Sequence, residues 1–193
     1  MIEIYTDGSC RKARNDGGMG VYIPAWDMHL AVAQTYVTNN RMELGAIYLG
    51  LLVAYEYAQA GQEVCIVSDS RYALDSVFTW WAGWVKSGFK TKSGDVKNLE
   101  LLKGIQTVLA DVRTLGVKVS HRWVKGHSGN AGNEEADRLS NWRANNMEGS
   151  CYALARPSSD ARTPLALYRL AHGHDLTERC YYPLLEALAE RAT

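Results

Sequence analysis

The stretch EVCIVSDS, residues 63–70, decides the class of fold, because a short apolar run is followed directly by an acidic residue. A continuous apolar run of this kind is typical of a strand that is buried on both faces of a sheet. We expect this strand to end at Asp69-Ser70. Residues 2–6, IEIYT, have the β-branched and aromatic content of another strand, which Asp7-Gly8 would end. Parallel pairing would place these two strand ends side by side.

The other predicted elements fit around this pair of strands. Residues 19–26 and 29–37 predict two more strands, which would form an antiparallel meander with the first. Apolar periodicity predicts the rest: a helix over 40–60, a helical segment from 72 towards 80, an exposed loop over 86–98, a helix over 99–115, a strand over 117–124 and a last helix over 133–145. This order predicts an α/β fold, with a mixed sheet and helices on its faces.

The chain has 193 residues, which is enough for one domain with a sizeable core and a remainder. Residues 148–193 differ from the rest, because they hold three of the four prolines and no clear strand. Within them, ARPSSDARTP is typical of a linker, and LTERCYYPLLEALAERA predicts a helix interrupted near Pro183. We therefore expect a main domain over 1–147 and an appended segment over 148–193 that is too small to fold alone.

Bulk composition narrows the functional classes. The 21 basic and 21 acidic residues balance, so any nucleic-acid interface must rest on local clusters. The cysteines form no CxxC pair and no zinc-like spacing, which predicts reduced thiols in a cytoplasmic protein, with a Cys151–Cys180 bridge as the alternative. The longest uncharged apolar run, residues 44–55, is too short to span a bilayer, so no membrane partner is expected.

Four acidic residues lie where predicted elements begin or end. Asp7 and Asp69 close strands, Glu43 lies in the first turn of a helix, and Asp137 lies near the start of the last helix. Functional residues of open α/β sheets gather at the carboxyl ends of strands. If the four carboxylates converge, their repulsion raises some of their pKa values unless cations neutralise them. Hard divalent ions, Mg²⁺ above all, accept such ligands, and two ions about 4 Å apart suit phosphodiester hydrolysis.

Each acid also has a structural interpretation. Asp7-Gly8 is compatible with a turn, and Glu43 three residues after Asn40 fits a capping box. Asp69-Ser70 is compatible with a helix start, and Asp137 could complement a helix dipole. Taken singly, each position favours the structural interpretation, so only their combination carries a functional one.

That combination resembles type 1 ribonuclease H over residues 1–147, followed by a C-terminal extension. The matching motifs, in order, are TDGSC (6–10), TNNRMEL (38–44), SDSRY (68–72) and WVKGHSGNAGNEEAD (123–137). The resemblance implies a five-stranded mixed sheet of three antiparallel strands plus parallel strands, flanked by helices. It also implies an endonuclease that cleaves the RNA strand of RNA–DNA hybrids with Mg²⁺ or Mn²⁺, leaving a 3′-hydroxyl and a 5′-phosphate. Asp7, Glu43, Asp69 and Asp137 would be the ligands of two metal ions, with Asp7 bridging them.

By the same resemblance, His127 lies on a flexible loop beside the active site. An imidazole titrates near neutral pH, so it can move a proton or help the product leave. Gly126 and Gly129 would give the loop its mobility. The alternative is an ordinary exposed loop histidine. We expect loss of His127 to slow the reaction, and loss of Asp7 or Asp69 to abolish it.

Two further segments are expected to contact the hybrid, whose RNA strand is distinguished by its 2′-hydroxyls across a wide minor groove. The resemblance implies contacts to these groups from Gly8, Ser9, Cys10, Asn39 and Asn40, and a grip on a DNA phosphate from Thr38. Helix capping is the alternative for Thr38 and Asn39. Segment 79–98 resembles the family's basic protrusion. By this resemblance its lysines would neutralise phosphates, namely Lys86, Lys90, Lys92 and Lys97. Its aromatic rings would pack on sugars or bases, namely Trp81, Trp84 and Phe89. A solvated lysine loop over buried tryptophans is the alternative.

Three features depart from the family pattern. RKARNDGG replaces a glycine- and proline-rich turn, with Ala13 at the position of an asparagine and basic neighbours that could substitute by charge. Arg71 follows SDS where an uncharged amide is common, which puts one substrate contact in doubt. The 148–193 extension lies outside the usual domain; we expect a monomer, with the extension as a candidate interaction or dimerisation element. Residues 172–175, HGHD, are interpreted as polar loop residues rather than metal ligands.

Two other functions share this architecture. DNA strand transfer of the integrase and transposase kind usually uses three acids and lacks the GHSG histidine loop, so His127 argues against it. A catalytically weak hybrid-binding module would be expected to lack at least one metal ligand, whereas all four acids are present here.

Overall fold

The computed structural model describes residues 1–11, 16–35, 37–145 and 151–154. Within these residues one mixed sheet has the strand order β7-β4-β1-β2-β3-β8. Its strands are β1 (Ile2–Arg11), β2 (Asp16–Ile23), β3 (Met28–Gln34), β4 (Glu63–Ser68), β7 (Lys118–Trp123) and β8 (Cys151–Leu154). β1, β2 and β3 form the antiparallel meander, and β4 pairs in parallel with β1 and with β7. The five-stranded mixed sheet is therefore confirmed.

β8 adds a sixth strand at the edge, antiparallel to β3, with Val32 opposite Cys151 and His29 opposite Leu154. The expectation that residues 148–193 contain no strand is therefore wrong for Cys151–Leu154. Backbone pairing to the open edge of β3 makes this strand, and so short a segment carries no periodicity that would predict it. The expected linker, the interrupted helix and Cys180 lie outside the described residues.

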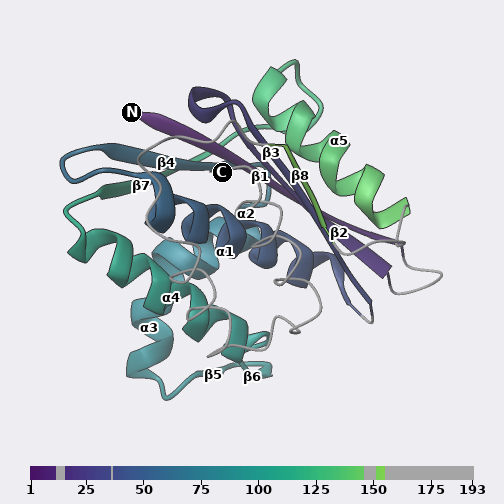
Figure 1. Cartoon of the computed structure of the whole chain (residues 1–193). Coiled ribbons are helices and arrows are strands. Elements are labelled where there is room, and N and C mark those ends of the chain that lie inside the picture. The colour runs from purple at the N-terminus through teal and green to yellow at the C-terminus, as the bar shows by residue number, and fades with distance from the viewer. Residues whose placement is uncertain (12–15, 36, 146–150, 155–193) are drawn as a thin grey trace.

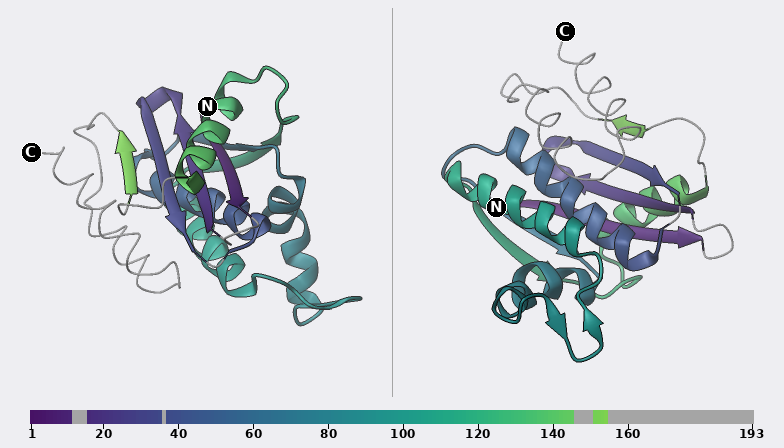
Figure 2. Two further views of the ribbon diagram at one scale, coloured as in Figure 1. Left: turned by 90° about the vertical axis from the view of Figure 1, so that its right-hand side faces the viewer. Right: turned by 90° about the horizontal axis from the view of Figure 1, so that it is seen from below.

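Helices cover both faces of the sheet (Figures 1 and 2). α1 and α4 pack together on one face, and α5 packs on β1, β2 and β3 from the other. The helical elements are η1 (Pro24–Trp26), α1 (Asn39–Tyr57), α2 (Arg71–Leu74), the π-helical η2 (Asp75–Trp80), α3 (Trp81–Lys86), α4 (Leu99–Thr114) and α5 (Ala131–Asn145). The short hairpin β5 (Lys90–Thr91) and β6 (Gly94–Asp95) lies within the segment expected to be a loop.

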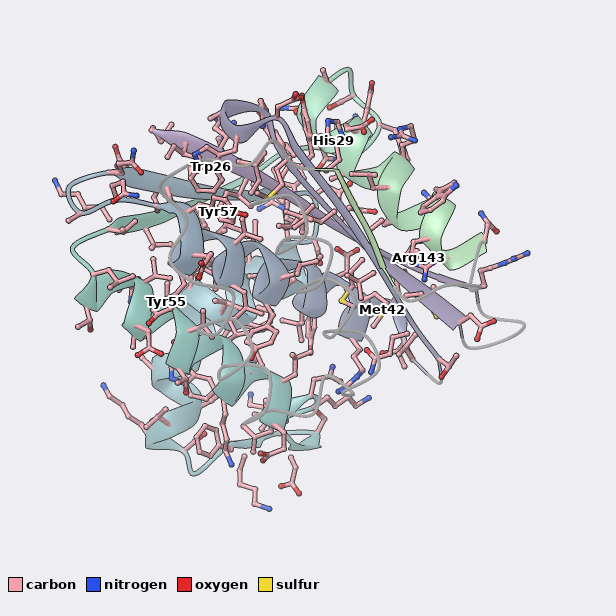
Figure 3. The ribbon with its side chains drawn as sticks, viewed as in Figure 1. Trp26, His29, Met42, Tyr55, Tyr57 and Arg143 are labelled. Carbon is pink, nitrogen blue, oxygen red and sulfur yellow. The ribbon has the colours of Figure 1, made fainter. Side chains whose placement is uncertain are left out.

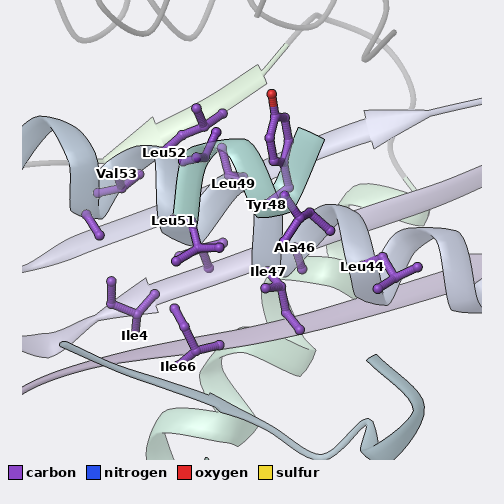
Figure 4. Packing of buried hydrophobic residues seen from close by; sticks show 14 of the residues in the cluster. Ile4, Leu44, Ala46, Ile47, Tyr48, Leu49, Leu51, Leu52, Val53 and Ile66 are labelled. Carbon is purple, nitrogen blue, oxygen red and sulfur yellow. The ribbon is translucent and has the colours of Figure 1, made fainter. Parts of the chain in front are cut away.

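The main core lies between α1 and the sheet. Fully buried aliphatic side chains of β1, β4 and α1 meet there, among them Ile4, Ile66 and Leu51 (Figure 4). α1 is buried along most of its length, because β1 and β2 lie beneath it and α4 lies beside it. At its end, the ring of Tyr57 packs on Trp26 of η1, with centroids 5.7 Å apart (Figure 3).

Three boundaries differ from the sequence expectations in ways that matter for the site. β1 continues past Asp7 to Arg11, because its ladder with β2 pairs Asp7 with Gly20 and continues beyond it. Glu43 lies beyond the first turn of α1, because the helix begins at Asn39. Asp137 lies near the middle of α5 rather than near its start, because that helix begins at Ala131.

None of the helices in the described part of the chain combines the length and apolarity that a bilayer crossing requires.

Candidate active site

Three carboxylates converge at one end of the central parallel strands. Asp7 of β1, Glu43 of α1 and Asp69 after β4 each offer an oxygen, and these atoms lie within 4.8 Å of one another. The strand register explains the meeting of the two aspartates. Tyr5 of β1 pairs with Val67 of β4, and Asp7 and Asp69 follow at the same offset along the two strands. The sequence expectation of adjacent acids therefore holds for these three residues.

Glu43 reaches the strands because α1 begins in direct contact with β1. Thr38 caps the helix, and its side-chain oxygen accepts the N–H of Arg41 at 3.3 Å. A Cβ atom added to Gly8 would lie 2.1 Å from the backbone nitrogen of Glu43, so no side chain fits between helix and strand. Gly8 therefore sets the separation between Glu43 and Asp7, whatever it contributes to substrate binding.

The pKa values of the buried acids reflect their crowding. Burial raises the pKa of Glu43 to about 9, and the charges of Asp7 and Asp69 add to the shift. Burial also raises the pKa of Asp7 to about 6, with the charges of Asp69 and Asp137 acting in the same direction, while the Ser140 hydroxyl opposes it. Oε2 of Glu43 is buried and has no hydrogen-bond partner among the described residues. An oxygen-only set in which Asp7 and Glu43 resist ionising, with a buried acceptor that lacks a partner among the described residues, fits a hard divalent cation.

Asp137 lies outside this tight group but remains close to it. Its charge raises the pKa of Asp7, and its Oδ1 accepts a hydrogen bond from Nδ2 of Asn141 at 2.8 Å. The structure thus brings three of the four predicted acids together and places the fourth within electrostatic range.

His127 lies on the loop between β7 and α5, with its side chain 81% exposed. Its Nδ1 is 3.9 Å from Oδ2 of Asp137, and its backbone has a positive φ of 50°. Gly126 lies against the site, because a Cβ atom there would be 2.6 Å from Oδ2 of Asp69. Gly129 also has a positive φ, of 85°, which favours glycine. The loop therefore places an accessible imidazole beside the acids.

Two polar residues that the sequence analysis did not single out hold the aspartates. Nδ2 of Asn133 donates to Oδ2 of Asp69 at 3.1 Å, and the Ser140 hydroxyl donates to Oδ2 of Asp7. Both residues belong to α5 and are almost fully buried. Asn133 lies four residues before Asp137 and Ser140 lies three residues after it, so all three lie on the same side of α5. Helical periodicity around Asp137 gives the side of the helix on which they lie, but nothing in the local sequence indicates their aspartate partners.

The residues expected to contact the RNA strand have structural contacts of their own. The Ser9 hydroxyl donates to Oδ1 of Asn141 at 2.7 Å, and the Cys10 thiol donates to the carbonyl of Val37 at 3.3 Å. Nδ2 of Asn39 donates to Oε1 of Glu43 at 3.3 Å, whereas Asn40 is exposed. Asn39 therefore connects the expected groove contacts to the acid cluster.

The basic protrusion has an aromatic base and an exposed lysine surface. Trp81 packs on Phe89 with centroids 5.4 Å apart, and Trp84 packs on Trp80 at 5.6 Å. Lys86, Lys92 and Lys97 are exposed, and Lys90 is exposed in an ion pair with Asp95. The tryptophans at 81 and 84 are half-buried, so part of each ring already serves packing.

Arg71 lies at the first position of α2, two residues after Asp69, and stacks on Trp123 of β7. Its guanidinium carbon is 3.8 Å from the ring centroid, a cation–π distance. The indole N–H of Trp123 donates to the backbone carbonyl of Asp69 at 2.9 Å. The departure at Arg71 therefore places an oriented positive charge at the rim of the acid cluster. Residues 12–15, which carry the other departure, and the 172–175 segment lie outside the described residues.

The strand order and the acids at the ends of adjacent parallel strands define the ribonuclease H-like class of nucleases. A sequence model of the family described as RNase H matches residues 1–145. The ribonuclease H of Albidiferax ferrireducens is 37% identical over 143 residues, covering 72% of this chain and 91% of that protein. That of Alcanivorax borkumensis is 38% identical over 143 residues, covering 72% of this chain and 89% of that protein. That of Methylorubrum extorquens is 36% identical over 169 residues, covering 84% of this chain and 69% of that protein.

This chain belongs to the ribonuclease H family. It is therefore a nuclease of a family that cleaves the RNA strand of RNA–DNA hybrids and generally depends on divalent metal ions.

Proposed function

We propose that this chain hydrolyses the RNA strand of RNA–DNA hybrids by a two-metal mechanism that leaves 3′-hydroxyl and 5′-phosphate ends. The observation that carries the proposal is the convergence of Asp7, Glu43 and Asp69 within 4.8 Å, with one buried oxygen of Glu43 that has no hydrogen-bond partner among the described residues. Such a set is unfavourable as three free anions and favourable as a ligand set.

Asp7, Glu43, Asp69 and Asp137 are the proposed ligands of Mg²⁺, or of Mn²⁺ in its place. When bound, these ions would supply the activation of water and the stabilisation of the leaving oxygen. Asp7 is buried and the charges of both Asp69 and Asp137 act on it, so it is the proposed bridging ligand. Asn133 would keep Asp69 in place by its hydrogen bond, and Gly126 by its close contact.

His127 is proposed to move a proton at the edge of the site and to assist product release. Its imidazole is exposed, and its 3.9 Å separation from Asp137 would let that carboxylate orient the ring towards a departing phosphate. The side chain lies outside the group of three converging acids, so it assists the reaction rather than defining the site.

Substrate binding is proposed to use two surfaces. Gly8, Ser9 and Cys10, which follow Asp7, and Thr38, Asn39 and Asn40, which precede Glu43, would contact the RNA strand and the groove. The protrusion would bind the DNA strand, with Lys86, Lys90 and Lys97 at phosphates and Trp81 and Trp84 at sugars or bases.

We propose residues 1–147 as the catalytic domain and 148–193 as an extension that docks on it through β8. The proposed active form is a monomer.

Cleavage of end-labelled RNA tests the proposal in four contexts: hybrid, single strand, RNA duplex and a DNA duplex that contains RNA. Reactions contain Mg²⁺, Mn²⁺ or chelator. Asp69→Asn is compared with Asp111→Asn, which makes the same change in α4, outside the acid cluster. Metal-dependent cleavage of the hybrid that is lost only in Asp69→Asn is expected. Cleavage that persists in chelator, or tight hybrid binding without cleavage, would contradict it.

A further inference from the structure

Ser140 lies directly against Asp7, in the contact between α5 and the sheet. Its side chain is fully buried, and its hydroxyl donates to Oδ2 of Asp7. The same hydroxyl oxygen lies 3.0 Å from the backbone carbonyl of Asp137. A serine hydroxyl has one proton to donate and both neighbours are acceptors, so the Asp7 carboxylate and the Asp137 carbonyl share this donor.

The position of Ser140 depends on two glycines of β2. A Cβ atom on Gly20 would lie 2.2 Å from the carbonyl oxygen of Ala136 and 2.7 Å from the nitrogen of Ser140. A Cβ atom on Gly18 would lie 2.1 Å from the carbonyl oxygen of Ser140. The backbone of α5 therefore rests on β2 with no side chain between them.

The strand register connects this contact to the active site. Gly20 is the cross-strand partner of Asp7, and directly opposite residues of an antiparallel pair point to the same face. Asp7 therefore points to the face that α5 covers, and Ser140 meets it there. The packing of α5 on Gly20 fixes the distance between the Ser140 hydroxyl and the Asp7 carboxylate.

Asp7 needs such a partner because its surroundings repel it. The negative charges of Asp69 and Asp137 lie nearby, and Glu43 is within the same group of converging oxygens. A side chain under this repulsion would turn away unless a donor held it. A carboxylate has four acceptor sites, so one serine hydrogen bond leaves Asp7 able to bind a cation.

We propose that Ser140 is a positioning residue, which holds the Asp7 carboxylate in the orientation that binds the divalent cation. This inference rests on the proposed function, because it assigns the cation to Asp7. Ser140 does not touch the substrate; it acts through Asp7.

The test is Mn²⁺ binding to the full chain without nucleic acid, by calorimetry. Removal of an outer partner of a metal ligand typically weakens metal binding about 10- to 100-fold, so Ser140→Ala is expected to raise the Mn²⁺ Kd at least about tenfold. The matched control is Ser76→Ala, which removes another fully buried hydroxyl. Oγ of Ser76 has no hydrogen-bond partner among the described residues. The control is expected to leave the Mn²⁺ Kd unchanged.

Ser140→Cys covers the case in which Ser140→Ala fails to fold, because a thiol has a similar shape but is a weak donor. Cleavage assays supply a second readout: both variants should need more Mg²⁺ for half-maximal activity, while hybrid binding in chelator stays unchanged. An unchanged Mn²⁺ Kd in a folded Ser140 variant, with wild-type binding intact, would overturn the role of Ser140 alone. Wild-type protein that binds no Mn²⁺ would overturn the metal assignment of the proposed function as well.

Discussion

Glu43→Gln in the metal-free protein is expected to increase stability, and the gain should grow with pH. The pKa of Glu43 is raised to about 9, against an ordinary 4.5 in the unfolded chain. Between these values, folding must take up a proton onto Glu43. The glutamate therefore stabilises the folded state least at high pH, and its contribution is lost as pH rises from about 4.5 towards about 9. Glutamine needs no proton.

The magnitude follows from the size of the shift. Within that pH range, each pH unit changes the free energy of unfolding by about 1.4 kcal/mol for a single group. At pH 7 the wild-type protein lies about 2.5 units above the unfolded pKa, so Glu43→Gln should be more stable by up to about 3 kcal/mol. At pH 4.5 the advantage should be close to zero. Glutamine keeps the acceptor oxygen for Nδ2 of Asn39, and its amide can donate towards Asp7 and Asp69, so no new strain is expected.

Urea denaturation in chelator measures this difference at three or four pH values between pH 4.5 and pH 8.5. Asp111→Asn serves as the matched control, because it neutralises an acid in α4 and should show no comparable pH-dependent gain. A Glu43→Gln advantage that does not change with pH would refute the reasoning, as would a variant less stable than wild type at pH 7. Adding Mg²⁺ should then stabilise wild type more than Glu43→Gln, because the glutamine is a poorer ligand.

Four other substitutions test separate parts of the site. Asp69→Asn should abolish hybrid cleavage, whereas His127→Ala should leave slow but measurable turnover, because the imidazole is exposed and outside the converging acids; equal losses in single-turnover assays would contradict this ranking. Gly8→Ala should destabilise the protein by about 1–3 kcal/mol in urea and reduce cleavage, because its Cβ would lie 2.1 Å from the nitrogen of Glu43; unaltered stability would refute that contact. Arg71→Gln should reduce the slope of log Kd against log salt for hybrid binding by about one, if its guanidinium neutralises one phosphate; an unchanged slope would remove Arg71 from the interface.

Local sequence predicts the elements whose burial does not depend on distant partners. The run at 63–68 was expected as a buried strand and is one, because parallel neighbours on both sides require apolar residues throughout. The end of β1 was placed too early, since Asp7-Gly8 has the composition of a turn. Its ladder with β2 keeps Asp7 extended, and that pairing is a tertiary fact which the local pattern does not contain.

The acids of the site could be predicted because each belongs to a recognisable motif, but their supporting residues could not. Ser140 and Asn133 owe their roles to the packing of α5 on the sheet, and neither differs locally from an ordinary polar helix residue. The same limit applies to Arg71. Its departure from the family pattern is visible in sequence, but its stacking on Trp123 requires β7 and α2 to be adjacent.

The glycines of β2 indicate a close helix–sheet contact that strand propensities do not predict. Glycine weakens a strand, so a segment that contains Gly17, Gly18 and Gly20 is a poor strand by composition. In this sheet, however, Gly18 and Gly20 point to one face, and the backbone of α5 occupies the space that their side chains would fill. Two glycines two residues apart in a strand therefore predict the close approach of another backbone on that face. Because Gly20 is paired with Asp7, the element that approaches must lie over the active site.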